Sequence, residues 1–134
     1  GLPAIMKGWI DRVLVMGRVY GGGEWYEDGA FKGKRAMLSL TTGGPESMYQ
    51  PDGLNGDITQ ILFPINHGIL RFTGFDVSPP FISWGPAHMD DEGRKNYLSL
   101  YRQRLADLDK TEPIKYPALD DYNSESFQLK PKEK

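Results

Sequence analysis

Apolar residues recur every three or four positions near the start of the chain, and polar residues lie between them. The stripe consists of Ile5, Met6, Trp9, Ile10, Val13 and Leu14. This spacing is typical of an amphipathic helix. Pro3 stands where a helix accepts a first-turn proline, so we predict a helix over residues 3–15. The following segment, 17–33, contains Gly21-Gly22-Gly23 and is predicted to be a loop.

A short apolar run over residues 35–40 leads into the most informative stretch, Thr41-Thr42-Gly43-Gly44. The run has the length and the continuous apolar character of a strand covered on both faces. Open α/β sheets bind ligands at the carboxyl ends of such strands. Glycines there let a flat ligand lie against bare peptide, with Tyr49 closing over it. The alternative interpretation is that these residues form only a simple turn after the strand.

The next elements are marked by caps and breakers. Asp57 is a suitable N-cap for a helix whose apolar positions run to Phe72, Pro64 should kink or split that helix, and Gly74 should end it. A second short strand is predicted at 75–77, ended by Pro79-Pro80, with a connecting loop over 81–85. Acidic residues 90–92 then begin a third helix. We expect one domain over 1–110 and a Pro-rich, partly disordered tail over 111–134.

Composition narrows the functional classes. The 134 residues carry a net charge of -2 and a pI of about 5.7, which argues against a nucleic-acid partner. The absence of cysteine excludes disulfides and thiolate metal sites. His67 and His88 lack a second ligand at metal spacing, so no metal site is predicted. No apolar run approaches the ~20 residues of a membrane span, and no secretory signal pattern is visible, so we expect a cytoplasmic protein.

Several blocks of sequence occur in a recognisable order. They are residues 3–13, Thr41-Thr42-Gly43-Gly44, Met48-Tyr49, residues 53–57 and residues 68–75. From Leu2 to about Leu108 the chain resembles the NAD(P)H:quinone oxidoreductases, which are flavin enzymes. The resemblance implies an α/β, flavodoxin-like fold with helices on both faces of a parallel sheet in the order 2-1-3-4-5. This chain maps onto the fourth and fifth strands only, so it is expected to be the carboxyl-terminal portion of such an enzyme, or to need a partner chain for the other strands.

The resemblance also implies roles for individual residues. Cofactor contacts are expected from Thr41, Thr42, Gly43 and Gly44 to the flavin ring, from Tyr49 to its O2 edge, and from Arg94 near the adenosine of FAD. Substrate-binding positions are Met48, Tyr20 and Phe72, the last two contributed by a second subunit. Simple packing remains the alternative for Tyr49 and Phe72, and a solvated charge for Arg94. The catalytic histidine of the family falls on Asn55, whose amide can donate a hydrogen bond but cannot shuttle a proton.

The function implied is two-electron reduction of a quinone by NAD(P)H through bound FAD, or FMN as second choice. The expected partner is a second copy of the chain, because Tyr20 and Phe72 are useful only when donated across a two-fold axis. Two alternatives remain. One is a flavin-binding regulatory subunit ancillary to a transporter with little turnover, and the other is a reductase of azo or nitro compounds. The sequence contains no Gly-x-Ser-x-Gly motif, which would indicate a hydrolase, and no P-loop, which would indicate an enzyme that binds nucleoside triphosphates.

Overall fold

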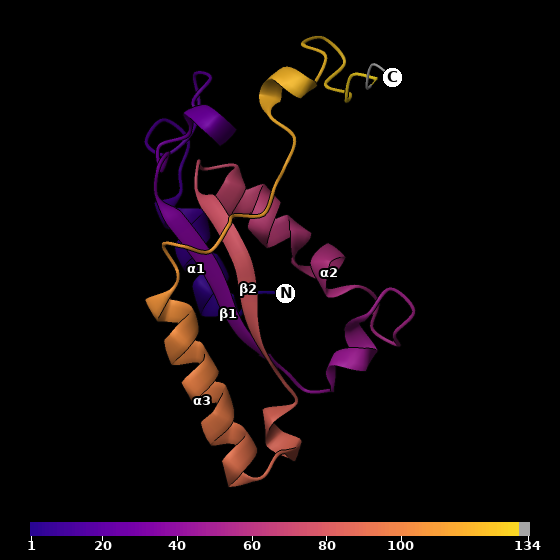
Figure 1. The fold of residues 1–134 in the computed structure, drawn as a ribbon. Coiled ribbons are helices and arrows are strands. Elements are labelled where there is room, and N and C mark those ends of the chain that lie inside the picture. The colour runs from indigo at the N-terminus through magenta and orange to yellow at the C-terminus, as the bar shows by residue number, and fades with distance from the viewer. Residues whose placement is uncertain (132–134) are drawn as a thin grey trace.

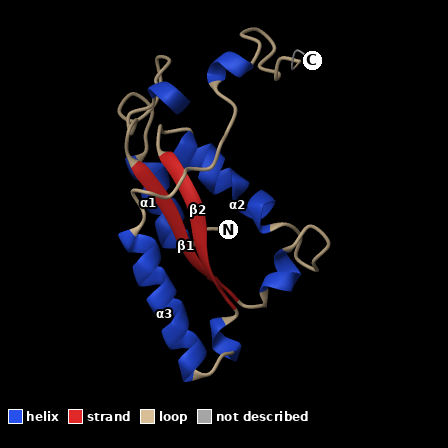
Figure 2. Ribbon diagram, viewed as in Figure 1, coloured by secondary structure: helices blue, strands red, loops and turns tan. Residues whose placement is uncertain are grey.

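The computed structural model describes residues 1–131, which fold into two parallel strands with helices on both faces (Figure 1). The main elements are α1 (Ala4–Val13), β1 (Arg35–Thr42), α2 (Ile58–Ile65), β2 (Asp76–Trp84) and α3 (Asp91–Ala106). α1 and α2 lie together over the Leu38 side of the strands. α3 covers the other side (Figure 2). There the ring centroids of Tyr101 and Phe81 are 4.9 Å apart. The predicted parallel arrangement is confirmed.

The second strand is longer than the sequence predicts. β2 continues through Pro79 and Pro80 to Trp84, so the expected strand end and the expected loop over 81–85 are wrong. Proline cannot donate a ladder hydrogen bond. The register accommodates both prolines at one irregularity, because Met37 pairs with Ser78 and Ser39 already pairs with Phe81. The strand therefore carries its pairing past the prolines to the tips of both strands.

The helix after Asp57 follows the predicted plan. The Asp57 side chain accepts a hydrogen bond from the Thr59 N–H at 2.8 Å. Behind Pro64 the helix changes into a π-helix over Asn66–Arg71, which is how the predicted split is realised. Gly74 ends it with a φ of +105°, in the left-handed region that favours glycine. The backbones of Gly29 and Gly74 meet there, since a Cβ on Gly29 would lie 2.6 Å from the Thr73 carbonyl.

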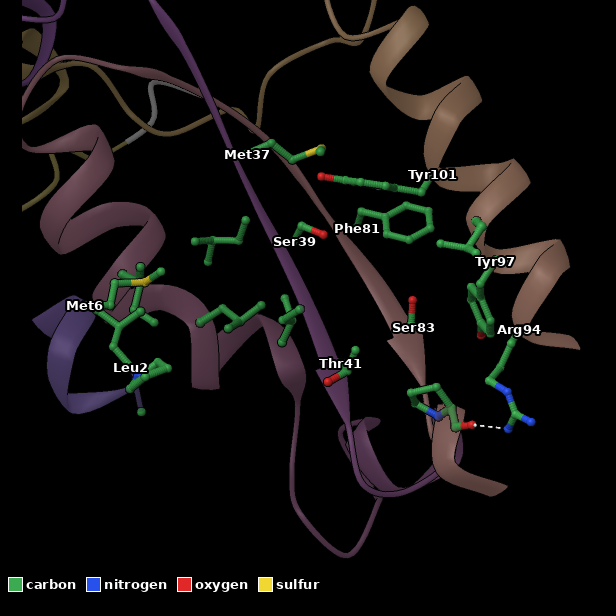
Figure 3. Close-up of a pocket in the computed structure, with 18 residues that line it drawn as sticks. Leu2, Met6, Met37, Ser39, Thr41, Phe81, Ser83, Arg94, Tyr97 and Tyr101 are labelled. Atoms are coloured by element: carbon green, nitrogen blue, oxygen red, sulfur yellow. Dashed lines mark hydrogen bonds between the residues drawn. The ribbon is translucent and has the colours of Figure 1, made fainter. Parts of the chain in front are cut away.

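One edge of β1 is unpaired within residues 1–131, because β2 is its single strand partner there. Five successive residues, 37–41, line a hollow of about 900 Å³ between α1 and α3. Successive strand residues point to opposite faces, so lining by all five shows that the hollow follows the strand edge. Figure 3 shows Met37, Ser39 and Thr41 along this edge. Among apolar side chains of the described part, Leu62 and Val77 alone are fully buried, so the chain covers its own apolar faces incompletely.

An aromatic cluster surrounds His67 at the end of α2. The imidazole stacks on the Phe63 ring at 4.6 Å and meets the Tyr116 ring edge to face at 5.1 Å. The Tyr26 ring lies tilted to it at 5.4 Å. Burial, and then the positive charge of Arg71, lower the pKa of His67 below its ordinary value of 6.5. Arg71 is itself paired with Glu27. His67 is therefore a half-buried residue whose ring is held by aromatic packing.

The segment after α3 returns along β2. The Ile114 N–H donates to the Val77 carbonyl at 2.7 Å, and a short 3₁₀ turn follows at Leu119–Asp121. The partly disordered tail over 111–134 stays a prediction, and its residues 132–134 lie outside the described residues. In the part of the chain that the structure describes, no helix is long and apolar enough to cross a membrane, and no cluster of metal-ligating side chains occurs.

Gly29→Ala should destabilise the fold, because the added methyl group would meet the backbone of Thr73 and Gly74. We expect the free energy of unfolding to fall by about 2 kcal/mol or more. The control is Gly8→Ala in α1, where a Cβ meets nothing within 4 Å, and the change should raise stability by up to ~1 kcal/mol. Urea unfolding of both variants checks this, and equal midpoints would contradict the close approach.

His67 should make stability depend on pH. Its pKa is lowered in the folded state, so the unfolded chain binds more protons below pH 6.5. The stability contributed by neutral His67 is present above pH 6.5 and is lost as the pH falls towards the lowered value. Thermal unfolding between pH 8 and 5 should show this loss, and His67→Phe, which keeps the stacked ring, should reduce the slope. His88→Asn, at an exposed position, serves as the control; a slope unchanged in His67→Phe would refute the assignment.

Candidate functional site

The tips of the two strands are tied together by Thr42. Its hydroxyl donates to the Gly44 carbonyl at 2.8 Å, and its own carbonyl accepts from the Gly85 N–H at 3.1 Å. Thr42 is 9% exposed, and Gly85 takes a φ of +57° to make the approach. The side chain of Thr42 is thus occupied in holding the loop, which leaves the exposed Thr41 and the loop backbone to face a ligand.

The two glycines after Thr42 have different surroundings. A Cβ on Gly43 would meet nothing within 4 Å, so one peptide face there is open. Gly44 is covered by the Met48 side chain, whose sulfur occupies the place of a Cβ. Within residues 1–131, the N–H groups of Gly43 and Gly44 donate to no backbone carbonyl. Two free donors beside open space fit the carbonyl and nitrogen edge of a flat, electron-rich ring such as a flavin.

The loop after Gly44 brings the other predicted residues back to it. A 3₁₀ turn over Glu46–Tyr49 is followed by a return in which the Asn55 N–H donates to the Met48 carbonyl at 2.8 Å. Gly53 permits this return, because a Cβ there would lie 2.5 Å from the Ser47 carbonyl oxygen. Met48 and Asn55 therefore lie next to the glycine loop, and Asn55 is exposed.

Tyr49 is joined to the strand tips through a residue that sequence reasoning missed. Its ring lies 5.5 Å from the indole of Trp84, with an interplanar angle of 38°. Trp84 is the last residue of β2 and pairs with Thr42. Because 81–85 reads as a loop behind two prolines, Trp84 could be placed here only from the pairing register. Thr41–Gly44, Met48, Tyr49 and Asn55 thus form one cluster at the carboxyl end of the strands.

Arg94 lies near this end, but its guanidinium is already engaged. It donates to the Pro86 carbonyl at 3.3 Å (Figure 3). It also donates to the Met89 carbonyl and pairs with the Asp91 carboxylate at 2.6 Å. These contacts hold the turn between β2 and α3. Thr41 and Arg94 both line the hollow along the β1 edge. Arg94 is therefore an exposed residue whose guanidinium is bonded to the turn between β2 and α3.

Tyr20 and Phe72 lie at the opposite end of the strands. Their rings are 5.2 Å apart, edge to face, and Tyr26 packs on Phe72 at 5.5 Å. Phe72 precedes the first residue of β2, while Trp84 is the last. A strand of this length spans about 25 Å. The structure brings Tyr20 and Phe72 together and separates both from the Thr41–Gly44 loop of the same chain.

Comparison with known proteins agrees with this geometry. A family model described as flavodoxin-like fold matches residues 1–105. Ribosyldihydronicotinamide dehydrogenase (quinone) of Mus musculus is 48% identical over 113 residues, covering 84% of this chain and 49% of that protein. NAD(P)H dehydrogenase (quinone) 1 of Rattus norvegicus is 40% identical over 135 residues, covering 99% of this chain and 49% of that protein. The chain thus spans about half the length of the curated relatives it matches.

More distant and structural similarities extend this picture. A potassium-efflux system ancillary protein, KefF, of an Enterobacter species is 32% identical, covering 81% of this chain and 58% of that protein. A crystal structure of a Klebsiella pneumoniae protein assigned as a quinone reductase has a TM-score of 0.93 and 42% identity, with 98% and 54% coverage. General stress protein 14 of Treponema denticola was solved in complex with FMN. It has a TM-score of 0.63 and 28% identity, and the match covers 82% of this chain and 59% of that protein. These matches confirm the resemblance to the quinone oxidoreductases and the fold that it implies.

Proposed function

We propose, from the premise that this chain belongs to the flavodoxin-like fold family, that it supplies the flavin ring site of an NAD(P)H-dependent quinone reductase. The observation that carries the proposal is the open peptide face at Gly43, with the unpaired N–H groups of Gly43 and Gly44 beside it. A bound flavin supplies the ring that takes a hydride from NAD(P)H and delivers it to the quinone. The protein has to hold that ring, exclude water and stabilise charge.

Each residue of the cluster has a separate task in this proposal. Gly43 and Gly44 donate their N–H groups to the ring edge, and Thr41 borders it. Thr42 acts indirectly by fixing the loop, because its hydroxyl donates a hydrogen bond to the Gly44 carbonyl. The phenol of Tyr49 donates towards negative charge on the O2 edge, and Met48 lines the acceptor side. Fixed donors of this kind stabilise developing charge without reorganisation.

FAD is the first choice of cofactor and FMN the second. The FMN complex of the Treponema denticola protein supports a flavin in general. Arg94 would support the adenosine of FAD only through the turn that it holds, since its guanidinium is bonded to the Pro86 and Met89 carbonyls and to Asp91. Reconstitution should therefore be carried out with each flavin separately.

The proposed assembly is a homodimer with shared sites. Tyr20 and Phe72 lie at the far end of the strands from the glycine loop, so the two groups cannot serve one site within a single chain. A two-fold axis that brings the Tyr20 end of one copy to the loop of the other completes each site. Reduced nicotinamide as the co-substrate favours a cytoplasmic location for the reaction.

A regulatory role is the second candidate. The similarity to the potassium-efflux ancillary protein favours it, and so does Asn55, which removes the proton-shuttling imidazole of the family pattern. The two candidates differ in turnover. Flavin bound with negligible quinone reduction, together with recovery of a membrane transporter in a pull-down, would favour the regulatory role over the reductase. Reduction of azo or nitro compounds is the remaining alternative, and it is tested by replacing the quinone with these acceptors in the NAD(P)H oxidation assay.

The proposal is tested by flavin titration and by NAD(P)H oxidation with menadione. The key variant is Gly43→Ala, which adds a methyl group to the open face without touching another residue. We expect unchanged stability and flavin affinity weakened about 10-fold or more, because the methyl holds the ring off the peptide. Gly68→Ala, also in open space, should bind flavin as the unaltered protein does. No flavin binding and no menadione-dependent oxidation would refute the proposal.

Asn55→His should restore a titrating group to the reductase. Between pH 5.5 and 8 the Asn55 protein should show no ionisation from this position, because an amide does not titrate. The variant should acquire a rate dependence with an apparent pKa near ~6.5, the ordinary value for histidine. Asn55→Gln keeps the amide and should retain the original profile. Superimposable pH–rate profiles for all three proteins would show that position 55 takes no part in proton delivery.

A further inference from the structure

Trp84 is held at the strand tips through its backbone. It ends β2 in register with Thr42. Its backbone N–H donates to the Tyr97 hydroxyl of α3 at 3.3 Å, and the next residue, Gly85, donates to the Thr42 carbonyl at 3.1 Å. The Trp84 backbone is therefore tied to both β1 and α3, so its indole projects from a fixed point of the fold.

Tyr49 is held less firmly. It ends a short 3₁₀ turn inside the loop that runs from Gly43 to Gly56. Among the described residues, the phenol hydroxyl has no hydrogen-bond partner, and the ring has one aromatic neighbour, the Trp84 indole at 5.5 Å. Both side chains are half-buried. Since no hydrogen bond within residues 1–131 holds the phenol hydroxyl, packing on Trp84 is a contact that can fix its direction.

We propose that Trp84 is a positioning residue for the flavin site: its indole fixes the direction in which the Tyr49 phenol presents its hydroxyl. This inference rests on the proposed function. A hydroxyl that stabilises charge must lie within hydrogen-bond range of the atom that carries it. Replacing the indole by an aliphatic side chain removes the ring contact and lets the phenol sample other rotamers. The effect of Trp84 should therefore pass through Tyr49 alone.

The expected size of the effect of Trp84→Leu follows from the usual strength of an aromatic pair. Such contacts change an equilibrium by about 2- to 10-fold. Trp84→Leu should lower the preference for reduced over oxidised flavin by about this factor, since the phenol no longer favours the charged, reduced ring. The preference is measured as the reduction potential of the bound flavin, with kcat and KM recorded beside it. Trp84→Phe keeps a ring at the same place and should recover most of the preference.

A double-mutant cycle separates positioning from general packing. Tyr49→Phe removes the hydroxyl and keeps the ring, and it should lower the same preference. If Trp84 acts through that hydroxyl, Trp84→Leu adds nothing in the Tyr49→Phe background. Trp9→Leu on α1, where Trp9 is 58% exposed, is the matched tryptophan control and should leave the potential unchanged. Additive effects of Trp84→Leu and Tyr49→Phe on the potential would overturn the proposal.

The contact itself is tested without flavin, so that failure of the proposed function stays distinguishable. In flavin-free protein with labelled tyrosine rings, the Tyr49 ring signals in the NMR spectrum should be shifted by the nearby indole, and Trp84→Leu should remove the shift. Absence of flavin binding with the ring shift present would refute the proposed function and, with it, the role of Trp84 towards the flavin. A Tyr49 ring signal that Trp84→Leu leaves unchanged would overturn the positioning role whether or not flavin binds.

Discussion

The hydrogen bonds of Thr42 are the constraint on which the site depends. Its hydroxyl fixes the Gly44 carbonyl, and its carbonyl takes the Gly85 N–H, so the ends of both strands and the start of the loop keep one arrangement. With Thr42 directed inward, Gly43 presents bare peptide to open space, and Met48 fills the place beside Gly44. Within residues 1–131, the N–H groups of Gly43 and Gly44 remain unpaired. A rigid scaffold carrying a bare loop is a common way to build a ligand site.

The sequence predicted the elements that carry their own local signals. The Asp57 cap, the helices α1 and α3, the interruption at Pro64 and the helix end at Gly74 are all determined within a few residues, and all are confirmed. The extension of β2 was missed, because only pairing with β1 shows how the ladder passes Pro79 and Pro80. Trp84 was missed for the same reason. The engagement of Arg94 by the turn between β2 and α3 is likewise a tertiary fact that no spacing in the sequence reveals.

The two ends of the strand pair give the chain its functional layout. The carboxyl end carries the glycine loop, Tyr49 and Trp84, and the other end carries Tyr20, Phe72 and the aromatic residues around His67. The free edge of β1 leaves a hollow beside the loop. These features agree with a chain that spans about half the length of its curated relatives. The two groups of aromatic residues lie a strand's length apart, which is the observation that supports the proposed dimer.

The most direct measurement of the central claim is hydrogen exchange at the Gly43 and Gly44 amides, followed by NMR with and without oxidised flavin. Both N–H groups are unpaired within residues 1–131, so both should exchange rapidly in the flavin-free protein and become protected when flavin binds. The Gly56 amide, which already donates to the Gly53 carbonyl at 3.0 Å, should change little. Flavin binding that leaves the Gly43 and Gly44 amides exchanging at their original rates would contradict the account, because the ring would then lie somewhere other than against this loop.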